Sequence, residues 1–587
     1  MRMENRKKNS LVRFLKPILV FSLISLLILL PQIYHKYIVL GNDVVFHFNR
    51  FYDLAMQMES GKFNYFQSIF GFNGSGRIVN ALYGYDLAFF LSFLLFLSKS
   101  WLKFQLLSGF LCLFVSGFNM YLLSRKANIS SNLAIISGMM YMSTASVTYY
   151  VHQQAFHGWG SAFLPLLFIP ALNSISDKER PINSVFLAIP VSILINSHVL
   201  TALIGVIAIV PFYIVSFINS KKKFTWMRDA LFAVVITLIL TMNTLLSYFE
   251  VFLSNNILSP FIPESMDLEA MKLSTSDIAY QKDAGLIFSA LLLFQICLTV
   301  LNWKKLDSTK KLINSTGIVF LLLSSTVFPW DLLANKFSFI SIFQFPSRFS
   351  VVAFLLLILG FTINVNELNK KEMYKKRSIL LSGVTMLSLL LVISVHNIMQ
   401  DKVIKWQENP ISMGNNKPGL QIEEKEVLKN NLRSSDLSLA LKSITKGTPD
   451  YLPIPKEKTS KEMYDIDKPY SIYNKEILNN ELNKQKQVLK DGSIEIKWVS
   501  EDTEKIILPV VIYSHSIVEI NGEIIPHKDL EKSLIGSLKI HPVVGTNTVN
   551  VSYQPKFNLK LVLLVKIVGW VFVIGYCILN KIKFSKK

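Results

Sequence analysis

Long apolar runs separated by short polar segments dominate the hydropathy pattern of this chain. A helix needs about 20 apolar residues to cross the hydrocarbon core of a bilayer, so each run of that length predicts a membrane-spanning helix. One further apolar piece, residues 81–97, is ambiguous by length alone. Apart from that piece, the pattern predicts about twelve spans, near residues 12–33, 102–123, 130–150, 161–175, 183–198, 199–219, 229–250, 285–302, 312–330, 349–366, 378–398 and 558–580.

Clusters of Lys and Arg decide whether residues 81–97 cross the membrane, because cytoplasmic loops carry an excess of both residues. If this piece does not cross, every basic cluster beside a span falls on the cytoplasmic side, from the N-terminal tail to the terminal KIKFSKK. If it does cross, most of these clusters face outward. We therefore expect residues 81–97 to lie in the interface or to re-enter, and both termini to be cytoplasmic. The outer regions are then 34–101, 151–160, 251–284, 331–348 and 399–557, and all nine histidines lie in or beside them.

The outer region after the eleventh predicted span has a different pattern. Runs such as SIEIKWVS and NTVNVSYQP alternate apolar and polar residues, which is typical of strands with one buried face. The pair Asn521-Gly522 favours a tight hairpin turn. We expect a small β-sandwich near residues 490–556. The predicted domains are a transmembrane domain over 1–398 that contains the first outer loop (34–101), an outer mixed and β-rich domain over 399–557, and a final helix with a basic tail over 558–587.

Composition agrees with a polytopic α-helical membrane protein and excludes other classes. With 51% hydrophobic residues, 17% charged residues and a mean hydropathy of +0.39, the chain is too apolar for a water-soluble protein of 587 residues. The net charge of +21 comes from short basic segments beside apolar runs, so we expect contact with the lipid bilayer and no nucleic acid. The three cysteines lie within apolar runs and lack the spacing of a metal site or a disulfide framework. The first apolar run lacks a small-residue cleavage site and indicates a retained anchor.

Three ionisable residues follow the first apolar run directly, in the stretch GNDVVFHFNR at 41–50. On a helix, Asp43, His47 and Arg50 project from one face because they are spaced i, i+4 and i+7. Ionisable groups near the hydrocarbon boundary are costly unless paired or solvated, so three together indicate a function. Two plainer interpretations stay open. The segment is an interfacial helix with a solvated face, or Asp43 caps the helix with Asn42.

The chain also resembles a known family over nearly its whole length. GNDVVFHFNR followed by GFNGSGRIVNALYGYDLAFF resembles the first outer loop of YfhO-type bacterial membrane proteins, related to the 6-pyruvoyl-tetrahydropterin-synthase-related membrane proteins of the GT-C glycosyltransferase superfamily. The chain departs from the family pattern at two positions. Relatives often carry an aromatic residue before the arginine of the QFP motif, where this chain has Ser347. Relatives also commonly carry a Gly-Glu pair after the third span, where this chain has Gly160-Ser161. Further matching segments are HGWGSAFLPLLF (157–168), NSHVLTALIG (196–205), FQFPSRFSVVAF (343–354), DYLP (450–453) and LPVVIYSHSIVEINGE (508–523).

The resemblance implies a membrane glycosyltransferase of the bacterial cell membrane. It implies a polyprenyl-phosphate-linked sugar as donor, and a cell-envelope polymer such as teichoic acid or polysaccharide, or a glycolipid, as acceptor on the outer face. It implies an inverting reaction in which Asp43, matching the carboxylate after the first span, is the catalytic residue. A positioned carboxylate that accepts the proton of an attacking hydroxyl contributes roughly 10²- to 10⁴-fold to the rate.

Five residues are candidates for substrate binding. Arg348 stands at the outer end of a predicted span after Pro346, where a guanidinium suits the donor phosphate; the alternative is an ordinary interfacial arginine. Arg50 either binds the phosphate or neutralises a nearby aspartate. Three histidines of the outer loops, His47, His157 and His198, are candidates for contact with the substrate. Together with Asp43 they are also candidate ligands of a divalent cation such as Mg²⁺ or Mn²⁺, with Asp43 and His47 as its first ligands.

Two other functions fit a membrane protein of this kind. A transporter or flippase of a lipid-linked saccharide would carry ionisable groups in mid-membrane positions and paired broken helices. The predicted spans are almost uncharged at their centres, and no duplicated half is visible. A non-catalytic scaffold that binds an envelope polymer would use the outer domain and would not need Asp43.

Overall fold

The computed structural model describes residues 2–261, 263–274, 282–371, 374–414 and 418–585. The chain forms two compact units. Unit 1 comprises Met1–Asn42, Gln105–Thr237 and Pro263–Asn415, and unit 2 comprises Asp43–Phe104, Leu238–Ile262 and Asn416–Lys587. This division differs from the one expected from the sequence, because the first outer loop groups with the C-terminal region instead of with the spans on either side of it.

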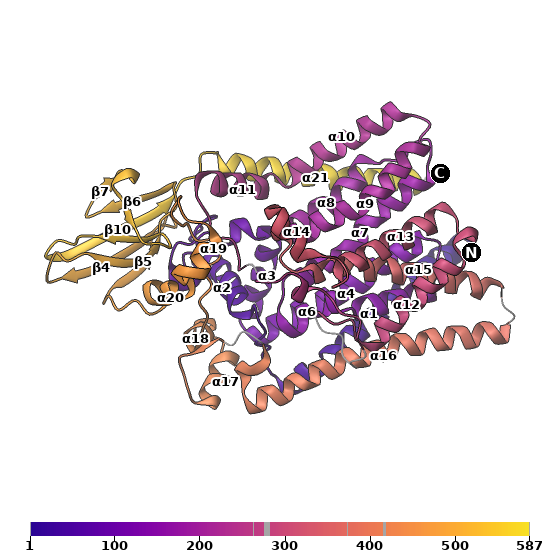
Figure 1. The fold of residues 1–587 in the computed structure, drawn as a ribbon, viewed down its shortest axis with the longest axis horizontal. Helices are drawn as coiled ribbons and strands as arrows, with labels where there is room; N and C mark the ends of the chain where they lie inside the picture. The colour runs from indigo at the N-terminus through magenta and orange to yellow at the C-terminus, as the bar shows by residue number, and fades with distance from the viewer. Residues whose placement is uncertain (1, 262, 275–281, 372–373, 415–417, 586–587) are drawn as a thin grey trace. The chain divides into compact units, whose positions relative to one another are not determined.

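Unit 1 is helical (Figure 1). Each helix is an apolar run bounded by polar, Gly or Pro residues, as expected where lipid or other helices cover the sides of a helix. Its α-helices are α1 (Arg2–His35), most of α4 (Trp101–Lys126), α5 (Ser131–Met142), α6 (Ala145–Gln153), α7 (His157–Ser176), α8 (Ser184–Ser197), α9 (Val199–Asn219), most of α10 (Lys223–Leu240), α12 (Gly285–Leu301), α13 (Ser308–Ser324), α14 (Trp330–Lys336), α15 (Ser350–Lys371) and α16 (Tyr374–Glu408).

Among the described residues, seven helices are long and apolar enough to cross a membrane, or up to eight if α10 and α11 (Met242–Ser254) form one bent span. These helices fit a multi-pass membrane protein, but they do not confirm twelve spans. The predicted span 130–150 is divided into two helices. Helix α5 ends before Ser143, and α6 begins after Thr144. Residues 81–97 contribute α3 (Tyr85–Ser98), whose 14 residues are too few for a full crossing.

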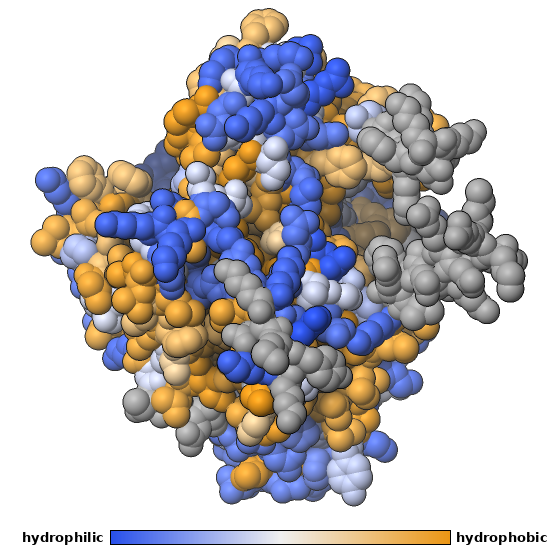
Figure 2. All heavy atoms as spheres, turned by 90° about the vertical axis from the view of Figure 1, so that its right-hand side faces the viewer, coloured by the Kyte–Doolittle hydropathy of each residue, from blue (hydrophilic) through white to orange (hydrophobic). Residues whose placement is uncertain are grey.

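The candidate spans carry exposed apolar side chains that suit contact with lipid. On α1, Leu19, Leu23 and Leu30 are 60%, 58% and 48% exposed and recur at helical spacing. The final helix, α21 (Leu559–Ser585), likewise exposes Val571 and Phe572. Figure 2 shows one face of the molecule, on which hydrophilic patches lie beside broad hydrophobic areas. Apolar helix sides with polar ends explain this mixture.

Unit 2 contains the predicted β-sandwich. A five-stranded antiparallel sheet has the order β3-β4-β10-β6-β7, and a three-stranded sheet has the order β5-β9-β8. Apolar residues of both sheets, such as Val549 and Leu508, share one buried core. The strands are β3 (Gln485–Val488), β4 (Ile494–Ser500), β5 (Ile506–Val511), β6 (Ser516–Ile520), β7 (Glu523–Ile525), β8 (Glu531–Lys532), β9 (Ser537–Ile540) and β10 (Gly545–Tyr553).

The predicted hairpin is confirmed at the turn between β6 and β7. Asn521 and Gly522 both have left-handed backbone angles, with φ of 52° and 91°. Two successive positive φ angles are those of a tight type I′ turn, for which Asn-Gly is the favoured sequence. Local sequence therefore determines this part of unit 2.

The remaining elements of unit 2 are short helices and bridges around the first outer loop and the segment before the sandwich. Helix α2 (Val44–Ser60) carries the first candidate residues. The other elements are the short helices η1 (Phe72–Gly74), η2 (Asn80–Leu82), α17 (Lys425–Arg433), α18 (Leu437–Ser443), α19 (Ser460–Glu462), η8 (Met463–Asp467), α20 (Pro469–Tyr473), η9 (Asn474–Leu478) and η10 (His527–Asp529), and the paired strands β1 (Gly419–Leu420) and β2 (Ile444–Thr445).

The first outer loop packs tightly onto α2. The Asp53 carboxylate accepts hydrogen bonds from the backbone N–H groups of Phe70 and Gly71 at 2.8 and 3.0 Å. A Cβ atom on Gly71 would lie 2.2 Å from the carbonyl oxygen of Asn49, so only glycine allows this approach. The GFNGSGR segment therefore has a fixed position on α2.

The same loop is bound to the sandwich, which explains the grouping of unit 2. The Lys486 ammonium donates hydrogen bonds to the carbonyl oxygens of Asn73 and Gly74 at 2.9 and 3.0 Å. The Val511 N–H of β5 donates to the Ser75 carbonyl at 2.8 Å. These contacts join segments more than 400 residues apart in sequence, so hydropathy could not reveal them.

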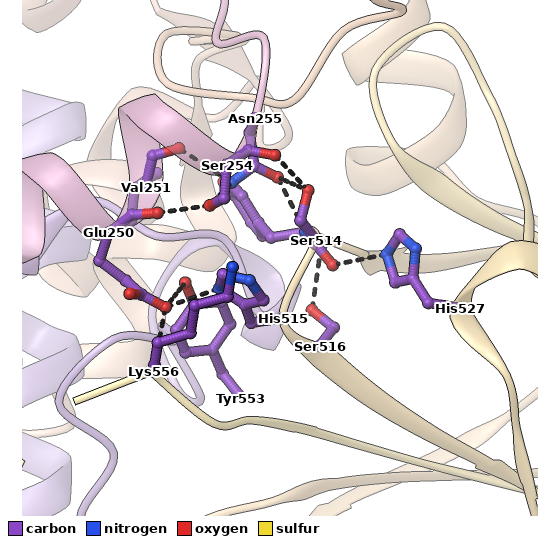
Figure 3. A network of polar contacts seen from close by, with 11 residues as sticks. Glu250, Val251, Ser254, Asn255, Ser514, His515, Ser516, His527, Tyr553 and Lys556 are labelled. Atoms are coloured by element: carbon purple, nitrogen blue, oxygen red, sulfur yellow. Dashed lines mark hydrogen bonds and ion pairs between the residues drawn. The ribbon is translucent and has the colours of Figure 1, made fainter. Parts of the chain in front are cut away.

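A polar network joins the end of α11 to the residues before β6 (Figure 3). Glu250 Oε1 lies 2.6 Å from His515 Nδ1 and accepts a hydrogen bond from the Lys556 N–H at 3.1 Å. The Ser514 hydroxyl donates to the Ser254 carbonyl oxygen at 2.6 Å. Ser, His and Glu are the residue types of a hydrolytic triad. Here, however, the Ser514 hydroxyl donates its hydrogen bond to a backbone carbonyl oxygen and not to the histidine. The network therefore connects structural elements of unit 2.

Candidate functional site

Asp43 occupies the N-cap position of α2 and is exposed. Its side chain makes no capping hydrogen bond, so simple helix capping does not account for it. A helix N-terminus carries partial positive charge from its N–H groups and favours a carboxylate beside it. Asp43 therefore presents a negatively charged oxygen at the accessible end of a helix.

His47 and Arg50 lie behind Asp43 on α2 and are buried. The Arg50 guanidinium donates from Nε to Asn80 Oδ1 at 3.1 Å, contacts His47 Nδ1 at 3.2 Å, and donates to the Tyr83 carbonyl oxygen. It also lies 4.6 Å from the centre of the Tyr83 ring. Burial lowers the pKa of Arg50 to about 10. The interpretation of α2 as a helix with a solvated polar face is therefore wrong, because its polar side packs against residues 80–83.

The segment before the sandwich supplies charged groups that interact with Asp43. Asp43 interacts electrostatically with Lys446 and with Asp450. Burial raises the pKa of Asp450 to about 6, the Arg77 guanidinium opposes this rise, and the negative charge of Asp43 adds to it. Burial also lowers the pKa of Lys446, against the attraction of both carboxylates. Unit 2 thus places two carboxylates and an ammonium in one electrostatic cluster.

In unit 1, a pocket brings Arg348 and His157 together with a set of hydroxyl groups. Arg348 lies at the start of the span that continues into α15, in the short helix η6 (Pro346–Phe349). Its NH1 group donates to Gln344 Oε1 at 3.2 Å, and its guanidinium lies 4.6 Å from the Phe345 ring centre. The pocket is lined by Ala145, Ser146, His157, Ser161, Thr201, Ser347, Arg348, Ser350 and Val351. Such a lining can donate several hydrogen bonds to an anion or to sugar hydroxyls.

The two predicted histidines of unit 1 are neighbours with different surroundings. The His157 ring lies 5.3 Å from the Tyr149 ring and 6.4 Å from the His198 ring, measured between centres. His198 Nδ1 accepts the backbone N–H of Thr201 at 3.2 Å and lies 2.8 Å from the Thr201 hydroxyl. His198 therefore caps α9, which is a structural role, whereas His157 lines the pocket.

The predicted site residues thus fall into two groups, each described within its own unit. Asp43, His47 and Arg50 belong to unit 2, and His157, His198 and Arg348 belong to unit 1. Sequence reasoning missed Lys446 and Asp450, which interact with Asp43, and Arg77, which interacts with Asp450, although the matching segments GFNGSGR and DYLP contain Arg77 and Asp450. The pocket hydroxyls, such as Ser146 and Thr201, carry no sequence signal of their own.

A metal site gains no support from the arrangement of side chains. Over the ranges that the structure describes, no group of three or more His, Cys, Asp or Glu residues is arranged to hold a metal ion. The Nδ1 atom of His47 faces the Arg50 guanidinium, a position that suits a hydrogen bond better than a cation. The pairing of Asp43 with His47 around a divalent cation stays a prediction.

Comparisons with known proteins give a coarse result. No protein-family model matches the chain, and no curated protein matches it. Among solved structures, the chain is similar to the oligosaccharyltransferase of Archaeoglobus fulgidus in the apo form, with a TM-score of 0.40 and 11% sequence identity over 67% of this chain. The chain spans 58% of the length of that protein. Function is therefore inferred from this chain's own residues.

Proposed function

We propose that this chain is a membrane glycosyltransferase of GT-C type that moves a sugar from a polyprenyl-phosphate donor to a polymer or glycolipid of the cell envelope. The reaction takes place on the outer face of the bacterial cell membrane, with both termini in the cytoplasm. The observation that carries the proposal is Asp43, an exposed carboxylate held at the N-terminus of α2 directly after the first candidate span.

Asp43 is the general base in this proposal. The attacking acceptor hydroxyl forms a bond from its oxygen to the anomeric carbon of the donor sugar, and its proton passes to the Asp43 carboxylate. The bond between the anomeric carbon and the phosphate oxygen breaks, and its electron pair leaves with the lipid phosphate. A general base must be accessible and ionised. Asp43 is exposed, and both the N-terminus of α2 and the nearby Lys446 ammonium favour the ionised form of its carboxyl group.

Arg348 binds the lipid phosphate in this proposal. Negative charge accumulates on the leaving phosphate, and a guanidinium can stabilise it by paired hydrogen bonds. Arg348 stands at the end of a candidate span and lines a pocket rich in hydroxyl groups, which suits a phosphate attached to a chain in the bilayer. His157 lines the same pocket and is a second donor contact in this proposal.

The proposal is tested in cells that lack the gene and receive it back in altered forms. The readout is the sugar composition of the purified envelope, with the amount of membrane-inserted protein measured in parallel. Wild-type chain restores the missing sugar, whereas Asp43→Asn restores at most about 1% of the transfer rate, because its amide cannot accept the proton. Asp502→Asn, which alters another exposed aspartate of unit 2, restores transfer fully.

Two results would overturn the proposal. If the envelope sugars do not differ between cells with and without the gene, the chain is no transferase for that envelope. If Asp43→Asn restores the sugar as well as wild type does, the scaffold or transporter interpretation replaces catalysis at this residue.

A further inference from the structure

Ser347 is a buried residue of the unit 1 pocket whose hydroxyl group makes no structural contact. It lines the pocket and is 3% exposed. Its hydroxyl oxygen has no hydrogen-bond partner within the described ranges of the chain. A buried hydroxyl without a partner loses its hydrogen bonds to water and gains none in return, so it is unfavourable unless another group engages it. The position of Ser347 therefore points to a ligand in the pocket.

The other hydroxyl groups of the pocket already have partners. The Ser161 hydroxyl donates to a backbone carbonyl oxygen at 3.1 Å, and the Thr201 hydroxyl lies 2.8 Å from an imidazole nitrogen. Ser146 Oγ and Ser350 Oγ lie 3.4 Å apart. Of the described pocket hydroxyls, the one on Ser347 is therefore the one that can bind a ligand without first giving up a contact.

Ser347 stands in the first turn of a long helix. Residues Pro346–Lys370 form one candidate span of 25 residues, and η6 is its first turn. The N–H groups at such a terminus carry partial positive charge and attract an anion. The next residue, Arg348, adds a full positive charge, and its NH1 group donates to Gln344 Oε1 at 3.2 Å. A guanidinium, a helix N-terminus and the Ser347 hydroxyl thus belong to one pocket, and all three favour an anion.

Close packing fixes the wall of the pocket that α7 and α9 form. A Cβ atom on Gly160 would lie 2.7 Å from Thr201 Oγ1, so glycine is needed for this approach of the two helices. The Tyr141 hydroxyl of α5 donates to the Ser161 carbonyl oxygen at 2.7 Å. A ligand therefore meets groups whose positions are already set, so little ordering opposes its binding.

The size and charge of the pocket restrict its ligand. The cavity offers about 20 Å³ to the centres of water-sized atoms, and one such atom needs ~10–15 Å³ on the same measure. Oxygen atoms of one phosphate group fit this space, whereas a sugar ring does not. Among the described residues that line the pocket, Arg348 carries the only fixed charge, and none is Asp or Glu. At pH 8, where an imidazole such as that of His157 is ordinarily neutral, the pocket balances a single negative charge.

We propose that the pocket holds a single phosphate group of the donor lipid, and that the Ser347 hydroxyl donates a hydrogen bond to an oxygen of that group beside Arg348. The inference rests on the proposed function and deepens it by naming the class of donor. The donor is a sugar linked to the prenyl chain through one phosphate, a phosphodiester with one negative charge, and not through a diphosphate. Rotation about the Cα–Cβ bond turns the serine hydroxyl toward the phosphate. A diphosphate brings a second negative charge that no second cation among the described lining residues balances.

The test measures binding to the purified full chain at pH 8 in dodecyl maltoside, a detergent without phosphate, and it needs no sugar transfer. The probes are the methyl esters of farnesyl phosphate and farnesyl diphosphate, which share a prenyl tail and carry one and two negative charges. Each Kd is obtained from the rise in Tm with probe concentration. The Kd of the monophosphate ester is about tenfold lower than that of the diphosphate ester, because one buried charge stays unbalanced in the latter. Equal Kd values contradict the monophosphate assignment.

Ser347→Ala separates the hydroxyl group from the rest of the site. It raises the Kd of the monophosphate ester about tenfold, because a hydrogen bond to a charged group is lost. Ser347→Cys raises the Kd less, since a thiol is a weaker donor. Without a probe, Ser347→Ala does not lower the Tm, because the hydroxyl that it removes has no partner among the described residues. An unchanged Kd in Ser347→Ala overturns the inference.

Ser192 of α8 supplies a matched control. It is 0% exposed, and its hydroxyl also has no hydrogen-bond partner in the described part of the chain, yet it is not among the residues that line the pocket. Ser192→Ala therefore removes an equivalent group from the same unit and leaves the Kd unchanged. A loss of affinity as large as that of Ser347→Ala would mean that both serines act through packing, and the proposed contact would be wrong.

Two further probes identify the source of the phosphate. Dimethyl phosphate has the charged group without the prenyl tail, and farnesol has the tail without the charged group. Dimethyl phosphate binds about 100-fold more weakly than the farnesyl ester, because it buries no apolar chain, and Ser347→Ala weakens it by the same factor as the ester. Farnesol binds wild type and Ser347→Ala equally. If dimethyl phosphate binds as tightly as the farnesyl ester, the pocket takes a soluble phosphate, and the assignment to a lipid donor is wrong.

The outcomes distinguish this inference from the proposed function. If sugar transfer depends on Asp43 but binding of the monophosphate ester does not depend on Ser347, the inference is wrong and the proposed function stands. If binding depends on Ser347 while no transfer depends on Asp43, the pocket is still a phosphate site, and the proposed catalysis at Asp43 is wrong.

Discussion

Two arginines in the matched segments of this chain have opposite surroundings. Arg50, in α2 of unit 2, is fully buried and makes its hydrogen bonds to Asn80 and Tyr83. Arg348, in unit 1, is partly exposed, rests on the Phe345 ring and lines a pocket. The sequence offered both as ligands of a donor phosphate. The difference shows that a guanidinium can bind a ligand only where its donors are accessible, and the structure gives that property to Arg348.

The pocket of unit 1 and the charged cluster of unit 2 also differ in the groups that they contain. The pocket of unit 1 combines a guanidinium and an imidazole with hydroxyls, which suits an anion or a sugar. The cluster of unit 2 combines the carboxylates of Asp43 and Asp450 with Lys446, which suits acceptance of a proton and of hydroxyl hydrogen bonds. Under the proposed function, the first set of groups suits the donor phosphate and the second suits hydroxyl groups of the acceptor.

The largest expected effect comes from removing the accessible arginine. Arg348→Met lowers sugar transfer about 100-fold or more, because the developing charge on the phosphate loses its hydrogen-bond donors. Arg348→Lys retains part of the activity, since an ammonium supplies charge without the planar pair of donors. Transfer rates in membranes measure both, and Arg180→Met, at an exposed arginine of unit 1, serves as the unaffected control. Full activity of Arg348→Met would remove the basis of the comparison.

The buried arginine is expected to affect stability instead. Arg50→Met leaves the Asn80 amide oxygen and the Tyr83 carbonyl oxygen without their donor, at a cost of roughly 2–4 kcal/mol. Thermal unfolding of the detergent-purified full chain measures this loss as a lower Tm. Arg348→Met shows a much smaller shift. A Tm for Arg50→Met equal to that of wild type contradicts the assigned role.

The smallest expected effect concerns Asp53, the buried aspartate within α2. Burial raises the pKa of Asp53 to about 6, against the hydrogen bonds from Phe70 and Gly71. Because the folded chain holds this proton more tightly than the unfolded chain does, the contribution of Asp53 to stability is present below about pH 4 and is lost as the pH rises through about 6. The loss is at most about 3 kcal/mol.

Comparison of Tm values between pH 4 and pH 7 for wild type and Asp53→Asn measures this contribution. The difference between the two chains changes across this interval, whereas the difference between wild type and Asp502→Asn stays constant. A constant difference for Asp53→Asn would mean that Asp53 keeps an ordinary pKa in the folded chain.

Local sequence patterns predicted the elements that depend on near neighbours. The alternation of residues 490–556 predicted the sandwich, and Asn521-Gly522 predicted its hairpin, because turn geometry and strand faces follow from adjacent residues. Apolar runs predicted long helices, but not where runs break, as at Ser143 and Thr144. Length alone therefore gave more spans than the described helices support.

Candidate residues were found by type and motif, and their roles were separated only by packing. The stretch 41–50 identified Asp43, His47 and Arg50 as candidates, yet it did not distinguish the exposed Asp43 from the buried Arg50. His157 and His198 looked alike in sequence, and the hydrogen bonds of His198 to Thr201 set it apart as a cap.

The sequence by itself determined that this is an apolar, helix-rich chain with a β-rich segment near its C-terminus and a carboxylate after its first long helix. Hydropathy and turn preferences depend on neighbouring residues, so they can be recognised from the sequence alone. Only the tertiary structure decided which charges meet, because Asp43, Arg77 and Asp450 are brought together by contacts over hundreds of residues. Electrostatic and hydrogen-bond energies depend on distance and burial in space, and the order of residues along the chain specifies neither directly.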